Sequence, residues 1–303
     1  MMQSIGELKR AARADVRTAS PKAWLMTLVY LALTAGLSYG VGLFVADPVM
    51  ALVQMYQSGL VLDRALLLTM QTVGGTGVFL NLLLLLTGIV FDFGYSQWCL
   101  GTVRGGIGEF SDLLGGFALT GRVLLLRLMT ILYCVMWYVV IFVPAGLVVM
   151  LGLALPLIGP ILILVVFLGA LVLFFSRVLG YAMAPYCLMD EPDKGVANAL
   201  HTSRRLMWHQ VGKLVLLQLS FLGWQLLGAL ISAAAELLLT LVGMAAVNLL
   251  GLGAGGTALV TKAAVMVGAL AAWPLYLWLT PYMSMAQCRF YDGLKNPEDV
   301  VHF

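Results

Sequence analysis

Long apolar stretches separated by short polar connections dominate the chain. A helix that crosses a bilayer needs about 20 mostly apolar residues, and six stretches meet this requirement. The expected spans cover residues 23–45, 76–99, 123–151, 159–188, 214–242 and 263–288. The pattern therefore predicts an all-α fold, a polytopic membrane bundle of six transmembrane helices.

One further apolar stretch lies between the first two spans, at residues 48–72. It contains polar side chains that a simple span would exclude, such as Gln54, Asp63 and Arg64. We expect it to lie on the outer surface or against the bundle. The whole chain, 1–303, is then expected to form a single integral membrane domain.

Amphipathic helices are expected before three of the spans. At residues 4–19, Ser4 and Glu7 have capping-box spacing, and apolar positions recur on one face among several cations. Similar stretches precede the third and fifth spans. Their apolar anchors are Phe110, Leu113, Leu114 and Phe117 in one, and Val196, Leu200 and Met207 in the other. We interpret all three as interfacial helices.

The returning helices of the three hairpins resemble one another. Each contains a tyrosine followed by a cysteine: Tyr95 and Cys99, Tyr181 and Cys187, and Tyr282 and Cys288. A threefold internal repeat of helical hairpins explains this pattern, as in many transporters. The alternative is that hairpins with cytoplasmic ends select such residues independently.

Composition excludes an ordinary soluble domain. Of the 303 residues 62% are apolar and only 10% are charged, where soluble domains carry about 25% charged residues. The mean hydropathy is +1.00. The net charge of +3 is too small to indicate nucleic acid as a partner.

The distribution of cations predicts the orientation. Of 17 Lys and Arg residues, fourteen precede the first span, lie around the even-to-odd connections or follow the last span. Only Arg64 and Lys262 lie on the other side, and Arg177 falls within a span. The positive-inside rule places both termini in the cytoplasm.

Charged residues within the spans are the candidate cavity residues, because an ionised side chain at bilayer depth usually faces a partner or water. Asp92 and Arg177 lie roughly 10 to 15 Å inside the cytoplasmic ends of their spans. We expect them to pair beside Tyr95 and Tyr181 and to line a polar cavity. The alternatives are a purely structural ion pair, or an arginine that reaches the headgroups. Glu236, in the fifth span, is a further candidate, either paired with Lys262 or coupled to protons.

Basic side chains on the amphipathic stretches are candidate contacts for anionic headgroups. They are Arg10, Arg13, Arg17, Arg204, Arg205 and Lys213. Membrane lipids are therefore expected partners, and the oligomeric state is left open.

Metal, cofactor and enzyme chemistry find little support. The acidic corner at 190–193, with His201 and His209, contains metal-ligand types, but acids around Pro192 also typify a helix start. We expect no metal and no cofactor. No Walker loop, H-E-x-x-H pair or G-x-S-x-G elbow occurs, so we expect a non-enzymatic protein.

Four segments carry a resemblance to a known family. They read IGELKRAARADVR, APYCLMDEPDKGVANALHTSRRLM, LSFLGWQLLG and WPLYLWLTPYMSMAQCRFYDGL. The chain resembles the bacterial integral membrane proteins grouped as domain of unknown function family 975. The resemblance implies a six-helix protein of the bacterial cell membrane, with no catalytic residues to carry over. The chain departs from the family pattern at residues 48–72 and 143–146.

Two functions follow as hypotheses. The first is a membrane protein that binds or moves a lipid-like or amphiphilic molecule. The second is an accessory or scaffold protein for another membrane protein. A polar cavity around Asp92 and Arg177 favours the first, and a dry interior with an exposed face of small residues favours the second.

Overall fold

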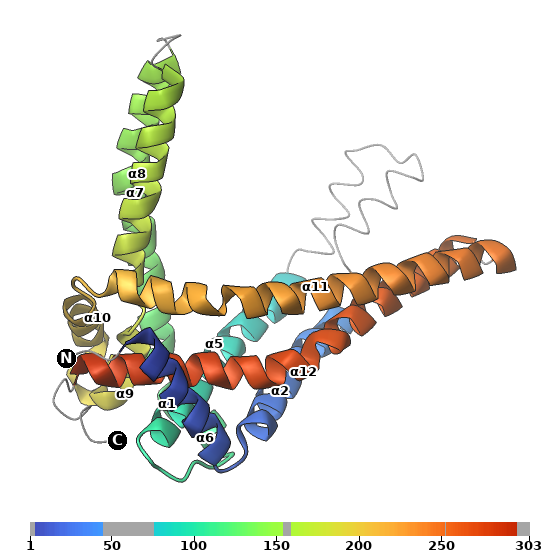
Figure 1. Ribbon diagram of the computed structural model, residues 1–303, viewed down its shortest axis with the longest axis horizontal. Coiled ribbons are helices and arrows are strands. Elements are labelled where there is room, and N and C mark those ends of the chain that lie inside the picture. The colour runs from blue at the N-terminus through green and yellow to red at the C-terminus, as the bar shows by residue number, and fades with distance from the viewer. Residues whose placement is uncertain (1–3, 45–75, 154–158, 252, 296–303) are drawn as a thin grey trace. The chain divides into compact units, whose positions relative to one another are not determined.

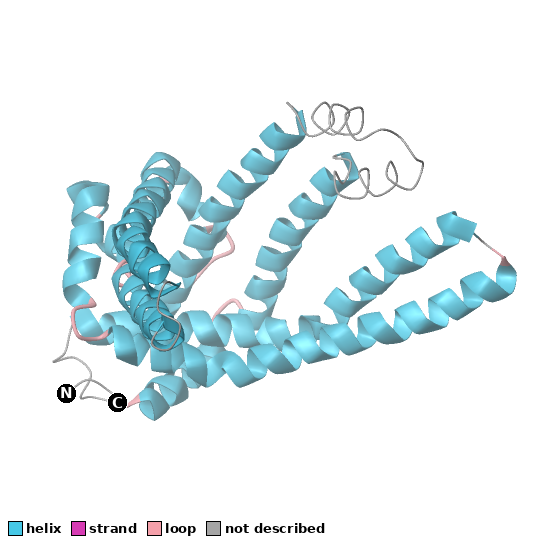
Figure 2. Cartoon of the chain, turned by 90° about the horizontal axis from the view of Figure 1, so that it is seen from above, coloured by secondary structure: helices cyan, strands magenta, loops and turns pink. Residues whose placement is uncertain are grey.

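The computed structural model describes residues 4–44, 76–153, 159–251 and 253–295. Within these ranges the chain forms helices joined by turns and contains no strand (Figure 2). This confirms the all-α prediction. The expected outer-surface segment at 48–72 lies outside the described residues.

The helices follow one another in the order labelled in Figure 1. They are α1 (Ile5–Thr18), α2 (Ala23–Phe44), α5 (Thr76–Val103), α6 (Asp112–Ala118), α7 (Thr120–Leu153), α8 (Gly159–Leu179), α9 (Ala184–Asp190), the short η1 (Pro192–Lys194), α10 (Gly195–Leu206), α11 (Val211–Leu250) and α12 (Gly253–Lys295).

The chain divides into two compact units. The first contains α1, α11 and α12 with the turn that follows α5, and the second contains most of α2 and α5 together with α6 to α10. In the first unit α1 packs on α12, and in the second α7 packs along α8. Figure 1 shows both contacts, with α1 in dark blue and α12 in red.

Five described helices are long and apolar enough to cross a membrane. These spans are Phe79–Val103, Thr120–Gly152, Gly159–Asp190, Val211–Leu250 and Gly255–Lys295. The first expected span corresponds to α2, whose described apolar helix, Ala23–Ser38, is shorter than these five. A multi-pass helical membrane protein is supported, and the number six stays a prediction.

The long hairpins expose their apolar side chains. In α7, Leu147 is 62% exposed and Leu151 is 70% exposed, and in α8 Val172 is 69% exposed. Small, isolated apolar patches are normal on soluble proteins, but apolar surface that continues along whole helices is unfavourable in water. The exposed surface therefore fits lipid as the solvent.

The fourth expected span, 159–188, is broken in the structure. α8 ends at Leu179, a turn follows, and α9 begins at Ala184 with Pro185 in its first turn. Proline lacks the amide hydrogen that a helix interior needs but fits the first turn of a new helix. Pro185 therefore begins a separate helix and does not lie inside a continuous one.

The Gly-rich segment at 245–256 is mostly helical. α11 continues to Leu250 and α12 begins at Gly253. Gly251 and Gly253 have φ values of 63° and 58°, a left-handed conformation that glycine adopts without steric cost. These two glycines thus lie at the facing ends of two long helices.

Each amphipathic helix packs on other helices of its own unit. On α5, the backbone at Gly94 touches the Leu113 carbonyl of α6, and Phe91 packs edge-on against Phe117. α10 packs on α7 and α9, and α1 packs on α12. These contacts hold the ends of the hairpins where the candidate sites lie.

Candidate functional site

Two arginines lie over one indole ring in the second unit. The Cζ atom of Arg177, near the end of α8, lies 4.8 Å from the centroid of the Trp137 ring in α7. The Cζ atom of Arg204, on α10, lies 5.7 Å from the same centroid. Both distances are within the range of cation–π attraction, about 6 Å. We call Arg177, Arg204 and Trp137 the two-arginine cluster.

Tyrosines extend this cluster. The Nε1 atom of Trp137 donates a hydrogen bond to the hydroxyl of Tyr181 at 3.3 Å. The Tyr181 ring stacks on Tyr133, with 5.5 Å between centroids. Trp137 is half-buried and Tyr181 is buried. The cluster thus has a fixed aromatic base beneath two cations.

The α10 helix places Arg204 through contacts of its buried face. Val196, Leu200 and Met207 are buried, as the sequence pattern predicts. The buried hydroxyl of Ser203 donates a hydrogen bond of 2.9 Å to the Gly180 carbonyl, which lies in the turn after α8. This bond ties α10 to the turn three residues beyond Arg177.

No described carboxylate forms an ion pair with either arginine of the cluster. The nearby acidic corner contacts other cations: Asp193 lies 3.6 Å from Arg122, and Glu191 lies 2.8 Å from Lys194. Two cations therefore contact one aromatic ring, and no carboxylate described in the structure forms an ion pair with either of them.

Asp92 has other neighbours than the expected one. Among the described residues it forms no ion pair with Arg177, and the cation that acts on it electrostatically is Arg127 of α7. Asp92 is exposed, between the buried Phe91 and Phe93 on α5. Its charge also acts on Tyr30 of α2. The expected ion pair of Asp92 with Arg177 is thus not among those of the described residues, and a cavity shared by the two residues stays a prediction.

The three tyrosines of the returning helices share one environment. All are buried, and each packs on an aromatic ring of the outgoing helix of its own hairpin. Tyr95 stacks on Tyr30 at 4.6 Å, Tyr181 stacks on Tyr133 at 5.5 Å, and Tyr282 meets Phe221 edge-on at 4.9 Å. The three cysteines that follow these tyrosines, Cys99, Cys187 and Cys288, are buried and form no disulfide within the described residues.

In the first unit, two cations of α1 contact the aromatic pair formed by Phe221 and Tyr282. Lys9 lies 4.4 Å from the Phe221 centroid and donates a hydrogen bond to the Ser220 carbonyl at 3.1 Å. Arg13 donates to the Tyr282 hydroxyl at 3.1 Å. Burial lowers the pKa of the Lys9 ammonium, with the charge of Arg13 as a smaller cause.

The basic residues expected at headgroups are therefore divided. Arg10, Arg13, Arg17, Arg204 and Arg205 are all exposed, and among them Arg13 and Arg204 also contact aromatic rings of the protein. Lys213 lies in the first turn of α11. The headgroup contacts of all six stay a prediction.

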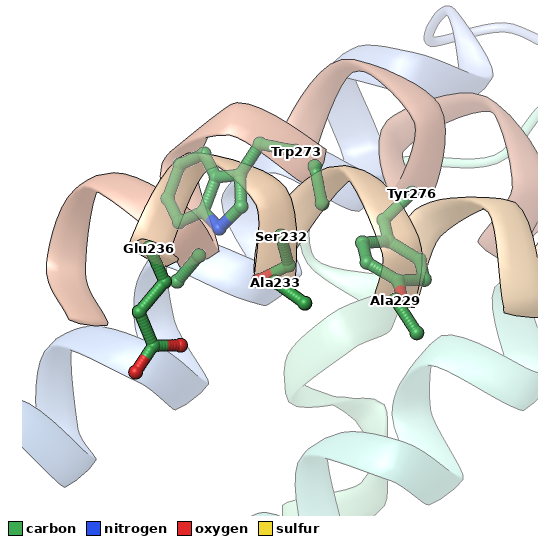
Figure 3. A pocket seen from close by; sticks show the side chains of 8 residues that line it. Ala229, Ser232, Ala233, Glu236, Trp273 and Tyr276 are labelled. Carbon is green, nitrogen blue, oxygen red and sulfur yellow. The ribbon is translucent and has the colours of Figure 1, made fainter. Parts of the chain in front are cut away.

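Glu236 lies beside a groove between α11 and α12. Figure 3 shows it at one end of a row of side chains, with Tyr276 near the other end. The groove has a volume of about 470 Å³, and its lining includes Ala229, Ser232, Ala233, Glu236, Trp273 and Tyr276. The expected pair of Glu236 with Lys262 is not among the ion pairs of the described residues.

The helix register explains why Glu236 and Lys262 do not meet. Glu236 lies level with Gly268, where an added Cβ would come within 3.1 Å of the Glu236 Cβ. Lys262 is six residues closer to the tip of the hairpin, about 9 Å along the helix axis. The two charges therefore lie at different depths.

Metal ligands do not gather in the part of the chain that the structure describes. No group of three or more His, Cys, Asp or Glu side chains there has the arrangement to hold an ion. The acidic corner contacts Arg122 and Lys194. Asp193 and Glu191 thus have cations as neighbours, and no side chain of this corner caps η1 or α10.

Sequence reasoning missed Trp137, Lys9, Tyr30 and Arg127. One signal was available for Trp137: the indole lies near the middle of a long apolar helix, although tryptophan is usually enriched at the membrane interfaces. Lys9 was grouped with its neighbours as a solvated cation, because its aromatic partner is 212 residues away in the sequence.

Comparisons with known proteins add the family. A search of curated proteins and a search of solved structures give no match. The family model described as "Protein of unknown function (DUF975)" matches residues 1–298. Because this match covers nearly the whole chain, the protein belongs to the DUF975 family.

Proposed function

We propose that this protein is a non-enzymatic, multi-pass membrane protein that binds an anionic lipid-like molecule at the two-arginine cluster. One observation carries the proposal: two guanidinium groups lie over the Trp137 ring without a described carboxylate partner. The headgroup of the ligand supplies the missing negative charge.

The chemistry of the cluster favours a phosphate-bearing headgroup. Guanidinium groups present a planar fork of donors that matches phosphate oxygens. Two neighbouring cations repel each other, and a shared anion converts this repulsion into attraction. Aromatic side chains with polar edges, such as Trp137 and Tyr181, suit the boundary between headgroups and acyl chains.

The surroundings of the cluster suit the apolar part of such a ligand. Arg177 lies two residues before the end of α8, so one side of the cluster faces the polar turn and α10. The other side continues into exposed apolar side chains such as Leu173 and Val140. An acyl chain lying along α7 and α8 would cover this surface while its headgroup contacts the arginines.

The orientation and the internal repeat belong to the same proposal. The cation distribution supports a cytoplasmic position for both termini, and the bound headgroup then lies in the inner leaflet of a bacterial cell membrane. Three buried tyrosines on aromatic rings, one in each hairpin, support six spans in a threefold repeat. α1 packs on α12 of the last hairpin.

Native mass spectrometry of the protein released gently from its own membrane tests the proposal. The wild type should retain a phosphate-bearing amphiphile, and Arg177→Ala and Arg204→Ala should both lose it. Arg205→Ala is the matched control, because Arg205 is exposed on the same helix. A protein without this ligand that carries a stoichiometric protein partner would contradict the proposal and favour the scaffold hypothesis.

A further inference from the structure

The groove between α11 and α12 combines a hollow, a charge and two aromatic rings. Its volume of about 470 Å³ falls within the range of small-molecule sites, about 300 to 1,000 Å³. It lies in the first unit, separate from the two-arginine cluster of the second unit. The two sites can therefore be tested independently.

Small residues form the hollow. Four alanines line the groove, including Ala229 and Ala233 on α11. At Gly268 an added Cβ would come within 2.9 Å of the Ser232 carbonyl, so the two backbones approach closely on one side of the hollow. Close backbones beside short side chains leave space next to Trp273 and Tyr276.

The charge in this groove lacks a described counter-ion. Glu236 is exposed within a candidate span and forms no ion pair with any described residue. A carboxylate at bilayer depth is unfavourable unless a cation, a proton or water compensates it. The register places Lys262 too far along the helix for this role.

The rings of Trp273 and Tyr276 favour a cation as the group that compensates the charge of the Glu236 carboxylate. Indole and phenol rings attract cations through their negative faces, and the Tyr276 hydroxyl adds a polar atom. A carboxylate and aromatic faces are both partners for a positive group.

We propose that this groove binds a hydrophobic ammonium cation, with the positive group between Glu236 and the Trp273 ring and its apolar chain over the alanines towards Tyr276. The recognition is by charge and by cation–π attraction. The open side of the groove admits the chain from the surrounding lipid.

Equilibrium dialysis of labelled dodecyltrimethylammonium against the protein in lipid nanodiscs tests this assignment. We expect Glu236→Gln, which preserves shape, to weaken binding about tenfold or more by removing the charge. Ala233→Leu should weaken binding by filling the hollow while it keeps the carboxylate. Lys262→Met, outside the groove on the same hairpin, should bind as the wild type does.

Three results would overturn the assignment. One is unchanged binding to Glu236→Gln, and another is equal binding of dodecanol, which has the same chain length without the charge. The third is the capture of a membrane protein by a cross-linker at position 233 with no binding of the ammonium probe, which would mark the groove as a helix-docking surface. Because the phosphate-lipid site contributes no residue here, failure of this assignment leaves that proposal unaffected.

Discussion

Asp15 and Arg289 form a two-armed ion pair across 274 residues of sequence. The Arg289 Nη2 atom lies 2.7 Å from one Asp15 oxygen, and Nε lies 2.8 Å from the other. Bidentate pairs of this kind fix geometry as well as charge. Together with Lys9 and Arg13, the pair holds the first amphipathic helix on the last long helix.

Breaking this pair should loosen α1 from α12. Arg289→Ala leaves the nearly buried Asp15 without its partner, so we expect the free energy of unfolding to fall by about 2 to 3 kcal/mol, between the values for exposed and fully buried pairs. Denaturant or thermal unfolding in detergent measures the change. Arg10→Ala, on the exposed side of α1, is the control. An equal loss in both variants would show that the pair does not hold α1.

Gly94 should tolerate no side chain. A Cβ there would meet the Leu113 carbonyl of α6, and backbone cannot move aside cheaply. We expect Gly94→Ala to destabilise the protein by about 1 to 3 kcal/mol. Gly88→Ala is the matched control in α5, because a Cβ there meets nothing within 4 Å, and it should be neutral or slightly stabilising. Equal unfolding midpoints for both variants would refute the α5 to α6 contact.

The N-terminus of α1 should respond to acid. The hydrogen bond from the Ser4 backbone amide, with a smaller contribution from the Ser4 side chain, holds the pKa of Glu7 below its ordinary 4.5. Because the folded pKa is lowered, the stabilisation is complete above pH 4.5 and is lost as the pH falls through the folded pKa.

Glu7→Gln isolates this effect, since glutamine also completes a capping box. The stability difference between wild type and variant should be constant above pH 4.5 and should change below it in the direction that disfavours the wild type. Thermal midpoints from pH 7 down to pH 3 measure it. Parallel curves over the whole range would contradict the assignment.

Ser203 should act as a positioning residue for Arg204. Its buried hydroxyl bonds the Gly180 carbonyl, so Ser203→Ala should cost about 1 kcal/mol of stability. It should also weaken binding of anionic amphiphile, because α10 is then free to shift from the turn after α8. Restored binding in Ser203→Thr, which keeps a hydroxyl, separates positioning from general destabilisation. If Ser203→Ala loses the expected stability but binds the anionic amphiphile as the wild type does, Ser203 has a structural role only.

Local signals in the sequence predicted the elements well. Ser4 and Glu7 form both hydrogen bonds of the expected capping box, and the apolar anchors of α10 are buried as expected. Such features depend on contacts between residues three or four positions apart in the sequence. The spacing of residue types along the chain shows these contacts directly. The break at Pro185 was harder to predict from the sequence, because proline is compatible with both a kinked helix and the start of a new helix.

Partners distant in the chain were not predictable in the same way. Arg177 was identified from its charge within a span. Its partner depends on which face of α7 lies opposite, and the sequence does not show whether this partner is Trp137 or Asp92. The same holds for Lys9 and Phe221. Spacing within a helix defines a face, whereas packing between helices decides what that face meets.

Binding of a soluble, short-chain phosphatidylglycerol, compared with phosphatidylcholine of the same chain length, tests the central claim most directly. Isothermal titration of the detergent-solubilised wild type should show tighter binding of the anionic lipid, by about tenfold or more. Both lipids carry a phosphate, so the preference reports the net negative charge that the two arginines balance. Arg204→Ala should lose this preference and Arg205→Ala should keep it. Equal affinity for both headgroups in the wild type, or a preference that survives loss of both Arg177 and Arg204, would contradict the claim.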